Sequence, residues 1–329
     1  MKCINKMRLL CLCGIAAVFM SGCGQTAVSY DNPYDIYSTS ADYGLASEGA
    51  GSEKTYFSQN LCVADNVNIG NDTTDSQVAE GAGTFNLATN TVTYAQNIYE
   101  KLYPASTTKI LTAYIALKYG NLEDYVTVSE NAADQASDSS VCGLKAGDVV
   151  QLKDLLYGMM LKSGNDAAIA IAEHIGGSVE GFADMMNQEA LAMGATRSHF
   201  VNPNGLPDEN HYTTAYDLYL IFNAAVQNDH FVKLISTKKY DASYMDASGA
   251  PVNVTWFNTN GYLKGTFSMP ENVTVIGGKT GTTEAAGSCL VLYSKNSSGK
   301  PYISVVLKGN SKRELYTLMT ELLTNFSKE

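Results

Sequence analysis

The stretch YPASTTKILTA, residues 103–113, places Ser106 three residues before Lys109. On a helix, residues three apart lie on the same face. A neutral lysine amine could then take the proton of the serine while the hydroxyl oxygen attacks a carbonyl carbon. Helix capping would explain the same residues, and the Ser-x-x-Lys pattern recurs at 236–239 and 297–300. The pattern therefore needs supporting residues elsewhere in the chain.

Two further motifs supply that support, Ser163-Gly-Asn165 and Lys279-Thr-Gly281. The Ser-x-Asn pattern is weak alone, since it recurs at 58–60 and 294–296, whereas Lys-Thr-Gly occurs once. Burial and a neighbouring cation, for which Lys279 is the candidate, would lower the pKa of Lys109. Ser163 could relay the proton to a leaving amine, and the Asn165 amide could hold the substrate backbone. Together the three motifs predict acyl transfer through a serine nucleophile.

Other kinds of chemistry find less support in the sequence. His199, Asp208 and His211 lack a regular zinc spacing, so structural roles in a turn-rich loop are expected for them and no metal site. Asp217 follows Thr214 by three residues, which predicts a helix cap. No Gly-x-Ser-x-Gly elbow is present, which disfavours a Ser-His-Asp hydrolase. No cofactor is implied.

The elements that must position the motifs follow a simple order along the chain. Residues 77–97 predict two strands around a turn, residues 106–228 are helical in pattern, and strands return after residue 236 before a closing helix at 311–326. This order predicts an α/β (α+β) fold with one antiparallel sheet completed by both ends of the domain. A helical lobe is inserted at about 112–230. The first motif would open a helix, the second would lie in a break between helices, and the third would end a strand.

The first residues predict export rather than fold. A basic leader precedes a short apolar run at 9–20, and Met20-Ser-Gly-Cys23 resembles a lipobox with lipid on Cys23. The alternative is an ordinary secretory signal with an incidental cysteine. We expect a signal peptide at 1–22, a flexible tether at 23–60 and a catalytic domain at 61–329, with no C-terminal β domain.

The net charge limits the partners that the chain can bind, and the cysteine content indicates the state of its thiols. Removal of residues 1–22 lowers the basic residues to 19 against 33 acidic ones, a net charge of −14. Such a chain lacks the basic footprint that nucleic acid requires. Cys62, Cys142 and Cys289 remain beyond the lipobox; one bridge is possible, but buried thiols are the expectation.

Over about residues 86–326 the chain resembles the serine-type D-alanyl-D-alanine carboxypeptidases, low-molecular-mass penicillin-binding proteins of the peptidase S11 family. The resemblance rests on YPASTTKILTA, GLKAGD, LKSGNDAA, FVNPNGL, HYTTAYDL and GGKTGTTEAAGSCLV. It implies the transpeptidase-like fold shared with serine β-lactamases. The implied substrate is a peptidoglycan stem peptide ending in D-Ala-D-Ala, with β-lactams as covalent inhibitors.

The resemblance also implies roles for individual residues. Ser106 is the nucleophile, and its backbone N–H and that of Thr282 would form the oxyanion hole. Lys279 and Thr280, beside Gly281, would receive the terminal carboxylate. Arg313, just after the last strand, matches the position from which the family's arginine recognises that carboxylate. The enzyme would act at the outer face of the bacterial cytoplasmic membrane, held by lipid alone, or in the periplasm.

Two other functions remain open at the level of sequence. A class A β-lactamase would need a glutamate for deacylation in a Glu-x-x-Leu-Asn-like segment, and no glutamate between the second and third motifs has asparagine four residues later. A non-catalytic lipoprotein that binds wall material or senses β-lactams could keep the fold without activity.

Overall fold

The computed structural model describes residues 57–327, and residues 60–327 form the compact unit that carries the motifs. The predictions for the signal peptide, for Cys23 and for nearly all of the tether lie outside the described residues. None of the helices within 57–327 combines the length and the apolar character needed to cross a membrane.

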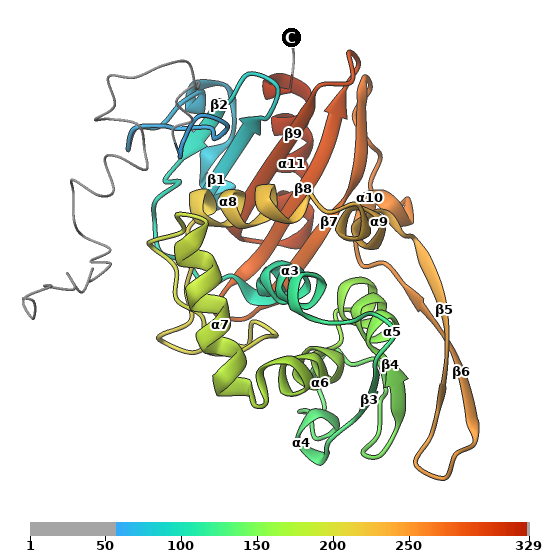
Figure 1. Ribbon diagram of the computed structural model, residues 1–329. Helices are drawn as coiled ribbons and strands as arrows, with labels where there is room; N and C mark the ends of the chain where they lie inside the picture. The colour runs from blue at the N-terminus through green and yellow to red at the C-terminus, as the bar shows by residue number, and fades with distance from the viewer. Residues whose placement is uncertain (1–56, 328–329) are drawn as a thin grey trace, which may run out of the picture. The chain divides into compact units, whose positions relative to one another are not determined.

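A five-stranded antiparallel sheet forms one half of the unit, in the order β2-β1-β9-β8-β7 (Figure 1). Both ends of the chain contribute to it, as the sequence predicts. The N-terminal strands are followed by a long helical insertion before the other three strands of the sheet. The five strands are β1 (Ala79–Asn86), β2 (Thr91–Gln96), β7 (Val273–Thr283), β8 (Gly287–Asn296) and β9 (Pro301–Gly309).

The two faces of this sheet pack against different helices because side chains alternate along a strand. On β9, Val305 and Leu307 join the core under α8 (Ala215–Ala225), whereas Val306 between them joins the core under α11 (Lys312–Phe326). Ser311 caps α11 by accepting from the Glu314 N–H and donating to its carboxylate, a capping box. The sheet is thereby covered on both faces, with α8 in front of it and α11 behind it in Figure 1.

The helical lobe lies between β2 and β7 in the sequence. The predicted cap at its last long helix is confirmed, since the Thr214 hydroxyl accepts from the Asp217 N–H at 3.0 Å. Besides α8, its helices are α3 (Lys109–Tyr119), α4 (Glu130–Ala133), α5 (Leu152–Tyr157), the π-turn η4 (Gly158–Lys162), α6 (Asn165–Gly176), α7 (Val179–Ala192) and α9 (Asp229–Ser236).

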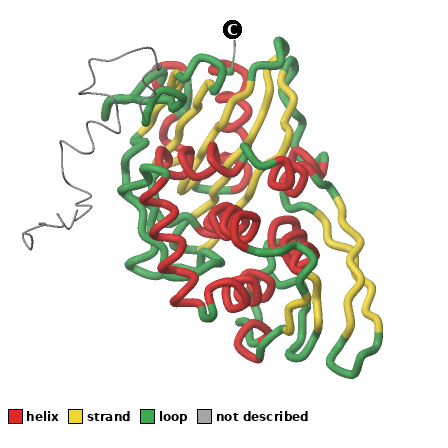
Figure 2. The backbone as a smooth tube through the Cα atoms, in the orientation of Figure 1, coloured by secondary structure: helices red, strands yellow, loops and turns green. Residues whose placement is uncertain are grey.

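A second sheet was not expected from the sequence. The order β3-β4-β5-β6 joins two short strands of the lobe, β3 (Tyr125–Thr127) and β4 (Val149–Gln151), to a hairpin of β5 (Lys239–Met245) and β6 (Pro251–Phe257). The sequence analysis placed the hairpin strands in the main sheet. They leave it because β4 pairs with β5, so the hairpin extends along the lobe (Figure 2).

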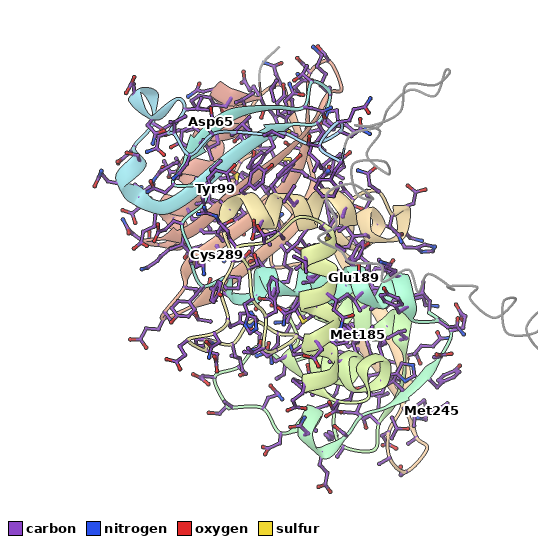
Figure 3. The ribbon with its side chains drawn as sticks, turned by 60° about the vertical axis from the view of Figure 1, so that its left-hand side comes forward. Asp65, Tyr99, Met185, Glu189, Met245 and Cys289 are labelled. Atoms are coloured by element: carbon purple, nitrogen blue, oxygen red, sulfur yellow. The ribbon has the colours of Figure 1, made fainter. Side chains whose placement is uncertain are left out.

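Buried and exposed side chains separate clearly within the unit. Figure 3 shows Cys289 among the strands of the main sheet and Glu189 on α7, and both residues are buried; Met245, at the end of β5, is half exposed.

The short helix α10 (Gly261–Lys264) links β6 to β7. This link carries the chain from the lobe back to the sheet, where the site lies.

Candidate active site

Ser106 lies at the junction of sheet and lobe, in the short 3₁₀ turn η3 (Ala105–Thr108) that leads directly into α3. The sequence predicts that Ser106 opens a helix, and the helix proper begins three residues later, at Lys109. A 3₁₀ turn has three residues per turn, so Ser106 and Lys109 still share a face. Ala105 has a φ of 47°, a left-handed conformation that is strained for a residue with a side chain.

Lys109 is fully buried and bonded to three oxygen atoms. Its Nζ lies 3.0 Å from Ser106 Oγ, 2.8 Å from Asn165 Oδ1 and 2.7 Å from the Asn204 carbonyl oxygen. A neutral amine has two N–H groups and one lone pair. The amide and the backbone carbonyl accept only, so they take the two N–H groups. The lone pair is then directed at Ser106, which can donate its hydroxyl proton to it.

The electrostatics of the site favour that neutral amine. Burial lowers the pKa of Lys109 well below its usual value, and the positive charge of Lys279 lowers it further, as expected from the sequence. Burial also lowers the pKa of Lys279, to about 7. Both shifts favour a lysine amine without its proton, which is the form that a general base requires.

The second motif contacts both lysines, Lys279 through Ser163 and Lys109 through Asn165. Ser163 lies in the break between η4 and α6 in a left-handed conformation, with a φ of 64°. Its Oγ accepts a hydrogen bond from Lys279 Nζ at 3.0 Å. Asn165, the first residue of α6, turns its amide oxygen to Lys109, which leaves the amide nitrogen for a substrate carbonyl. This places all three motifs around one point, as the sequence analysis predicts.

Strand β7 forms the opposite wall of the site. It does not end before Lys279 but continues to Thr283, because residues 279–283 pair with residues 287–291 of β8. Gly281 lies so close to η3 that a Cβ atom there would stand 2.8 Å from the Ser106 backbone nitrogen. The Thr280 hydroxyl shares a 2.7 Å hydrogen bond with that of Thr259. The strand edge thus lies beside the nucleophile, as an extended substrate would require.

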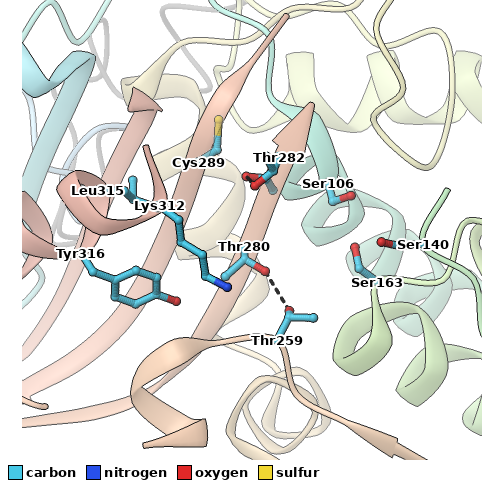
Figure 4. Close-up of a pocket in the computed structure, with 11 residues that line it drawn as sticks. Ser106, Ser140, Ser163, Thr259, Thr280, Thr282, Cys289, Lys312, Leu315 and Tyr316 are labelled. Atoms are coloured by element: carbon cyan, nitrogen blue, oxygen red, sulfur yellow. Dashed lines mark hydrogen bonds between the residues drawn. The ribbon is translucent and has the colours of Figure 1, made fainter. Parts of the chain in front are cut away.

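An open cavity of about 180 Å³ lies between these walls (Figure 4). It is lined by Ser106, Ser140, Ser163, Thr259, Thr280, Gly281, Thr282, Cys289, Lys312, Leu315 and Tyr316. Lys312, the first residue of α11, extends toward Thr280 and Thr259 in Figure 4. Arg313 is exposed and is not among the lining residues. None of the lining residues is acidic.

Sequence reasoning missed six of these residues as site residues: Ser140, Thr259, Cys289, Lys312, Leu315 and Tyr316. No motif singles out the first two, whose positions depend on how the loops pack. Lys312 could have been found from its position beside Arg313, because side chains of adjacent helix residues point in directions about 100° apart and only one can face a given cleft.

The loop of residues 199–213 was expected to be structural, and it is also part of the site. It supplies the Asn204 carbonyl to Lys109, and Thr112 donates to the Pro203 carbonyl at 2.6 Å. Gly205 has a φ of 86°, and a Cβ atom there would lie 1.8 Å from the Ala105 carbonyl oxygen. The loop can approach η3 only because residue 205 has no side chain.

His211 fastens this loop to the nucleophile turn. Its Nδ1 accepts from the Val201 N–H at 3.1 Å, so Nε2 carries the proton and donates to the Thr108 hydroxyl at 2.9 Å. Burial lowers the pKa of His211 to about 4. Within residues 57–327, no three histidine, cysteine, aspartate or glutamate residues are grouped to hold a metal ion. Cys62, Cys142 and Cys289 are buried free thiols, as expected.

Comparison with known sequences identifies relatives that are all named as D-alanyl-D-alanine carboxypeptidases. The family model for peptidase S11, D-alanyl-D-alanine carboxypeptidase, matches residues 71–311. The chain is 34% identical to the D-alanyl-D-alanine carboxypeptidase DacF of Bacillus subtilis over 71% of its own length and 58% of that protein. It is 34% identical to a D-alanyl-D-alanine carboxypeptidase of Streptomyces over 71% of its own length and 81% of that protein. The chain thus spans little more than half the length of some curated relatives.

Solved structures agree with this grouping. The DD-transpeptidase of Streptomyces K15 superposes with a TM-score of 0.69 at 33% identity, over 75% of this chain and 95% of that one. The D-alanyl-D-alanine carboxypeptidase DacD of Francisella tularensis superposes with a TM-score of 0.65 at 29% identity, over 89% and 75%. The expected mixed α/β fold is therefore confirmed.

We predict that Gly205→Ala slows acylation of Ser106 by a fluorescent penicillin at least about tenfold, because the methyl group must push the Asn204 carbonyl away from Lys109. Gly249→Ala is the matched control. Its φ is also positive, at 82°, but no atom lies within 4 Å of the new methyl group. Both variants should lose about 1 kcal/mol of stability from the backbone strain alone. Equal acylation rates in the two variants would contradict the prediction.

The second prediction concerns acid stability. Unfolding returns His211 to a pKa near 6.5, so between pH 6.5 and 4 the unfolded chain binds a proton that the folded chain does not. Its contribution to stability is therefore complete above pH 6.5 and lost as the pH falls toward 4, on the order of 3 kcal/mol. His211→Asn keeps an acceptor for the Val201 N–H and cannot titrate.

Urea unfolding at pH 7 and at pH 4.5 measures the effect. The variant should be less stable at pH 7, where the hydrogen bond to Thr108 is lost, but should lose less stability between the two pH values than the wild type. An equal loss in both proteins would show that His211 does not cause the acid sensitivity.

Proposed function

Because this chain belongs to the D-alanyl-D-alanine carboxypeptidase family, peptidase S11, we propose that it removes the terminal D-alanine from peptidoglycan stem peptides. The observation that carries the proposal is the 3.0 Å contact of Ser106 Oγ with a fully buried Lys109, whose other two partners only accept, so that its lone pair faces the Ser106 hydroxyl as donor. A serine held by such a base can attack the peptide carbonyl between the last two D-alanines.

The residues divide the reaction into steps. Lys109 takes the Ser106 proton as Oγ forms a bond to the carbonyl carbon. The backbone N–H groups of Ser106 and Thr282 stabilise the oxyanion, a role that the approach of Gly281 to η3 supports. The C–N bond then breaks as Ser163, bonded to Lys279, gives its hydroxyl proton to the nitrogen of the leaving D-alanine and takes the proton that Lys109 holds, which leaves Lys109 neutral again. Water, deprotonated by Lys109, then hydrolyses the ester and frees Ser106.

Recognition of the terminal carboxylate requires a cation at the far end of the cavity. Lys279 is already committed to Ser163 Oγ and to the Thr280 carbonyl at 2.8 Å, and its pKa near 7 leaves it only partly charged at neutral pH. Lys312 is exposed, lines the cavity and extends toward Thr280. We therefore propose Lys312 with the Thr280 hydroxyl as the carboxylate site, in place of Arg313.

The two alternative functions predict different fates for a β-lactam. A β-lactamase needs a base that deacylates the penicilloyl ester, and no acidic side chain lines this cavity among the described residues. The proposed enzyme should therefore hold a penicillin as a persistent ester on Ser106. A non-catalytic binding protein would form no ester at all.

The N-terminal assignments remain proposals that rest on sequence. We propose that residues 1–22 are removed, that lipid on Cys23 holds the protein at the outer face of the cytoplasmic membrane, and that residues 23–60 tether the domain at 61–329. Labelling of growing cells with a fatty acid analogue tests this; Cys23→Ser should abolish the label.

We predict that full-length protein forms a long-lived adduct with a fluorescent penicillin and that Ser106→Ala forms none. Ser140→Ala is the matched control, since Ser140 also presents a hydroxyl to the cavity and should keep the adduct. The measurement is fluorescence of the denatured protein on a gel, followed over hours. Destruction of the drug without an adduct would favour the β-lactamase function, and an intact drug would favour the binding protein.

A further prediction separates the two candidate cations. Lys312→Met should lower kcat/KM for a peptide ending in D-Ala-D-Ala by about 10- to 100-fold, the scale of a hydrogen bond between charged groups. A peptide with a terminal carboxamide in place of the carboxylate should be processed equally by wild type and variant. Arg313→Met should stay within about twofold of wild type on both peptides. Loss of activity in the Arg313 variant alone would return the role to Arg313.

A further inference from the structure

Asp166 is a buried carboxylate beside the site, and the proposed reaction does not use it. It follows Asn165 in α6 and is 1% exposed. Its two oxygen atoms accept four backbone N–H groups. Oδ1 takes those of Cys142 and Ala167 at 2.9 and 2.8 Å, and Oδ2 takes those of Gly143 and Leu144 at 2.9 and 3.1 Å. A buried charge with this many donors is stable without a cation in contact.

Three of the four donors belong to one segment, residues 140–144, which forms part of the wall of the cavity. The segment also accepts hydrogen bonds from both sides. The Asn165 N–H donates to the Ser140 carbonyl at 2.8 Å, and the Trp256 indole donates to the Cys142 carbonyl at 3.4 Å. Ser140 itself lines the cavity. Asp166 therefore ties a wall of the cleft to the residue that orients Lys109.

The charge of Asp166 matters for a second reason. Lys109 and Lys279 are both buried, and neither forms a salt bridge with any residue in the described part of the chain. Asp166 is the carboxylate that acts electrostatically on Lys109. Its two oxygen atoms are occupied by four backbone N–H groups, so it lies near Lys109 without accepting a hydrogen bond from it.

We propose that Asp166 is a positioning residue of the reaction, which fixes the wall at residues 140–144 and provides a buried counter-charge to Lys109. The inference rests on the proposed function, because it needs Lys109 to act as the base. It goes beyond the three motifs, since Asp166 touches neither the nucleophile nor the cavity.

Several other groups act on Lys109, and each must be held constant in a test. Lys279 faces it from β7, the Cys142 thiol from the segment that Asp166 binds, and His211 from the loop of residues 199–213. Burial raises the pKa of Cys142 well above its usual value, and His211 is neutral above about pH 4. Between about pH 5 and 8 these two groups therefore stay neutral, and their titration does not contribute to a pH dependence in that range.

The test is Asp166→Asn, which keeps the size of the side chain, removes the charge and turns an NH₂ group toward two of the four donors. With the negative charge gone, the ammonium form of Lys109 is stabilised less and its pKa falls. When the rate of acylation by penicillin is plotted against pH, the acidic limb of the curve should therefore move to lower pH by about half a unit or more. The plateau rate should fall at least about tenfold, because the wall is displaced.

Asp217→Asn is the matched control. Asp217 is also buried in the lobe and accepts from the Arg197 N–H at 2.8 Å and from the Ser198 hydroxyl at 2.7 Å, away from Lys109. This variant should lose thermal stability. The acidic limb of its pH profile should stay at the wild-type position, and its plateau rate of acylation should stay within about twofold of the wild-type rate.

The outcomes distinguish this inference from the proposed function. If the two variants lose similar stability and both keep the wild-type pH profile and plateau rate, Asp166 is structural only and the inference is wrong. If the limb of Asp166→Asn moves and its plateau rate falls while Asp217→Asn is unchanged, the inference holds. If the wild type itself forms no penicillin adduct, the proposed function fails, and with it the premise of the inference.

Discussion

The burial of two lysines within one small volume is the constraint on which this structure depends. Each ammonium group loses most of its hydration, and together they repel each other. Within residues 57–327 neither has a carboxylate in contact, which would hold its proton and prevent it from acting as a base. Lys109 is satisfied instead by an amide and a backbone carbonyl, and Lys279 by a hydroxyl and a backbone carbonyl. The proton is left mobile because every partner is neutral.

No single element of secondary structure could build this environment, which explains the division into sheet and lobe. The hydrogen-bond partners of the two lysines come from η3, from the break before α6 and the first residue of α6, from the loop at residue 204 and from β7 itself. Left-handed backbone occurs at or beside these positions, at Ala105, Ser163 and Gly205, and is strained at the first two. Such conformations persist only where surrounding packing determines them, and here helices cover both faces of the sheet and the loop is bonded to α3.

Much of this arrangement could be predicted from residue types and spacing. Ser106, Lys109, Ser163, Asn165 and Lys279 were all identified and lie around one point. The motifs are local, and each lies on an element with a clear pattern. The second sheet was missed because β3 and β4 have three residues each, too few for any periodicity, and their pairing with the hairpin is decided by tertiary contacts. The Asn204 carbonyl was missed for a related reason, since a backbone acceptor has no signature in the side chain that carries it.

The difference between Lys312 and Arg313 shows where such reasoning stops. Position along the chain favours Arg313, and arginine is the better partner for a carboxylate because it can bond in two places. Yet a helix turns about 100° for each residue, and the cap at Ser311 fixes where α11 begins. The direction in which each side chain points therefore matters more here than its residue type, and the exposed amine that extends toward Thr280 belongs to Lys312. A lysine holds a carboxylate as a point charge with less demand on geometry, so under the proposed function this cavity would select the free chain end mainly by charge and by the Thr280 hydroxyl.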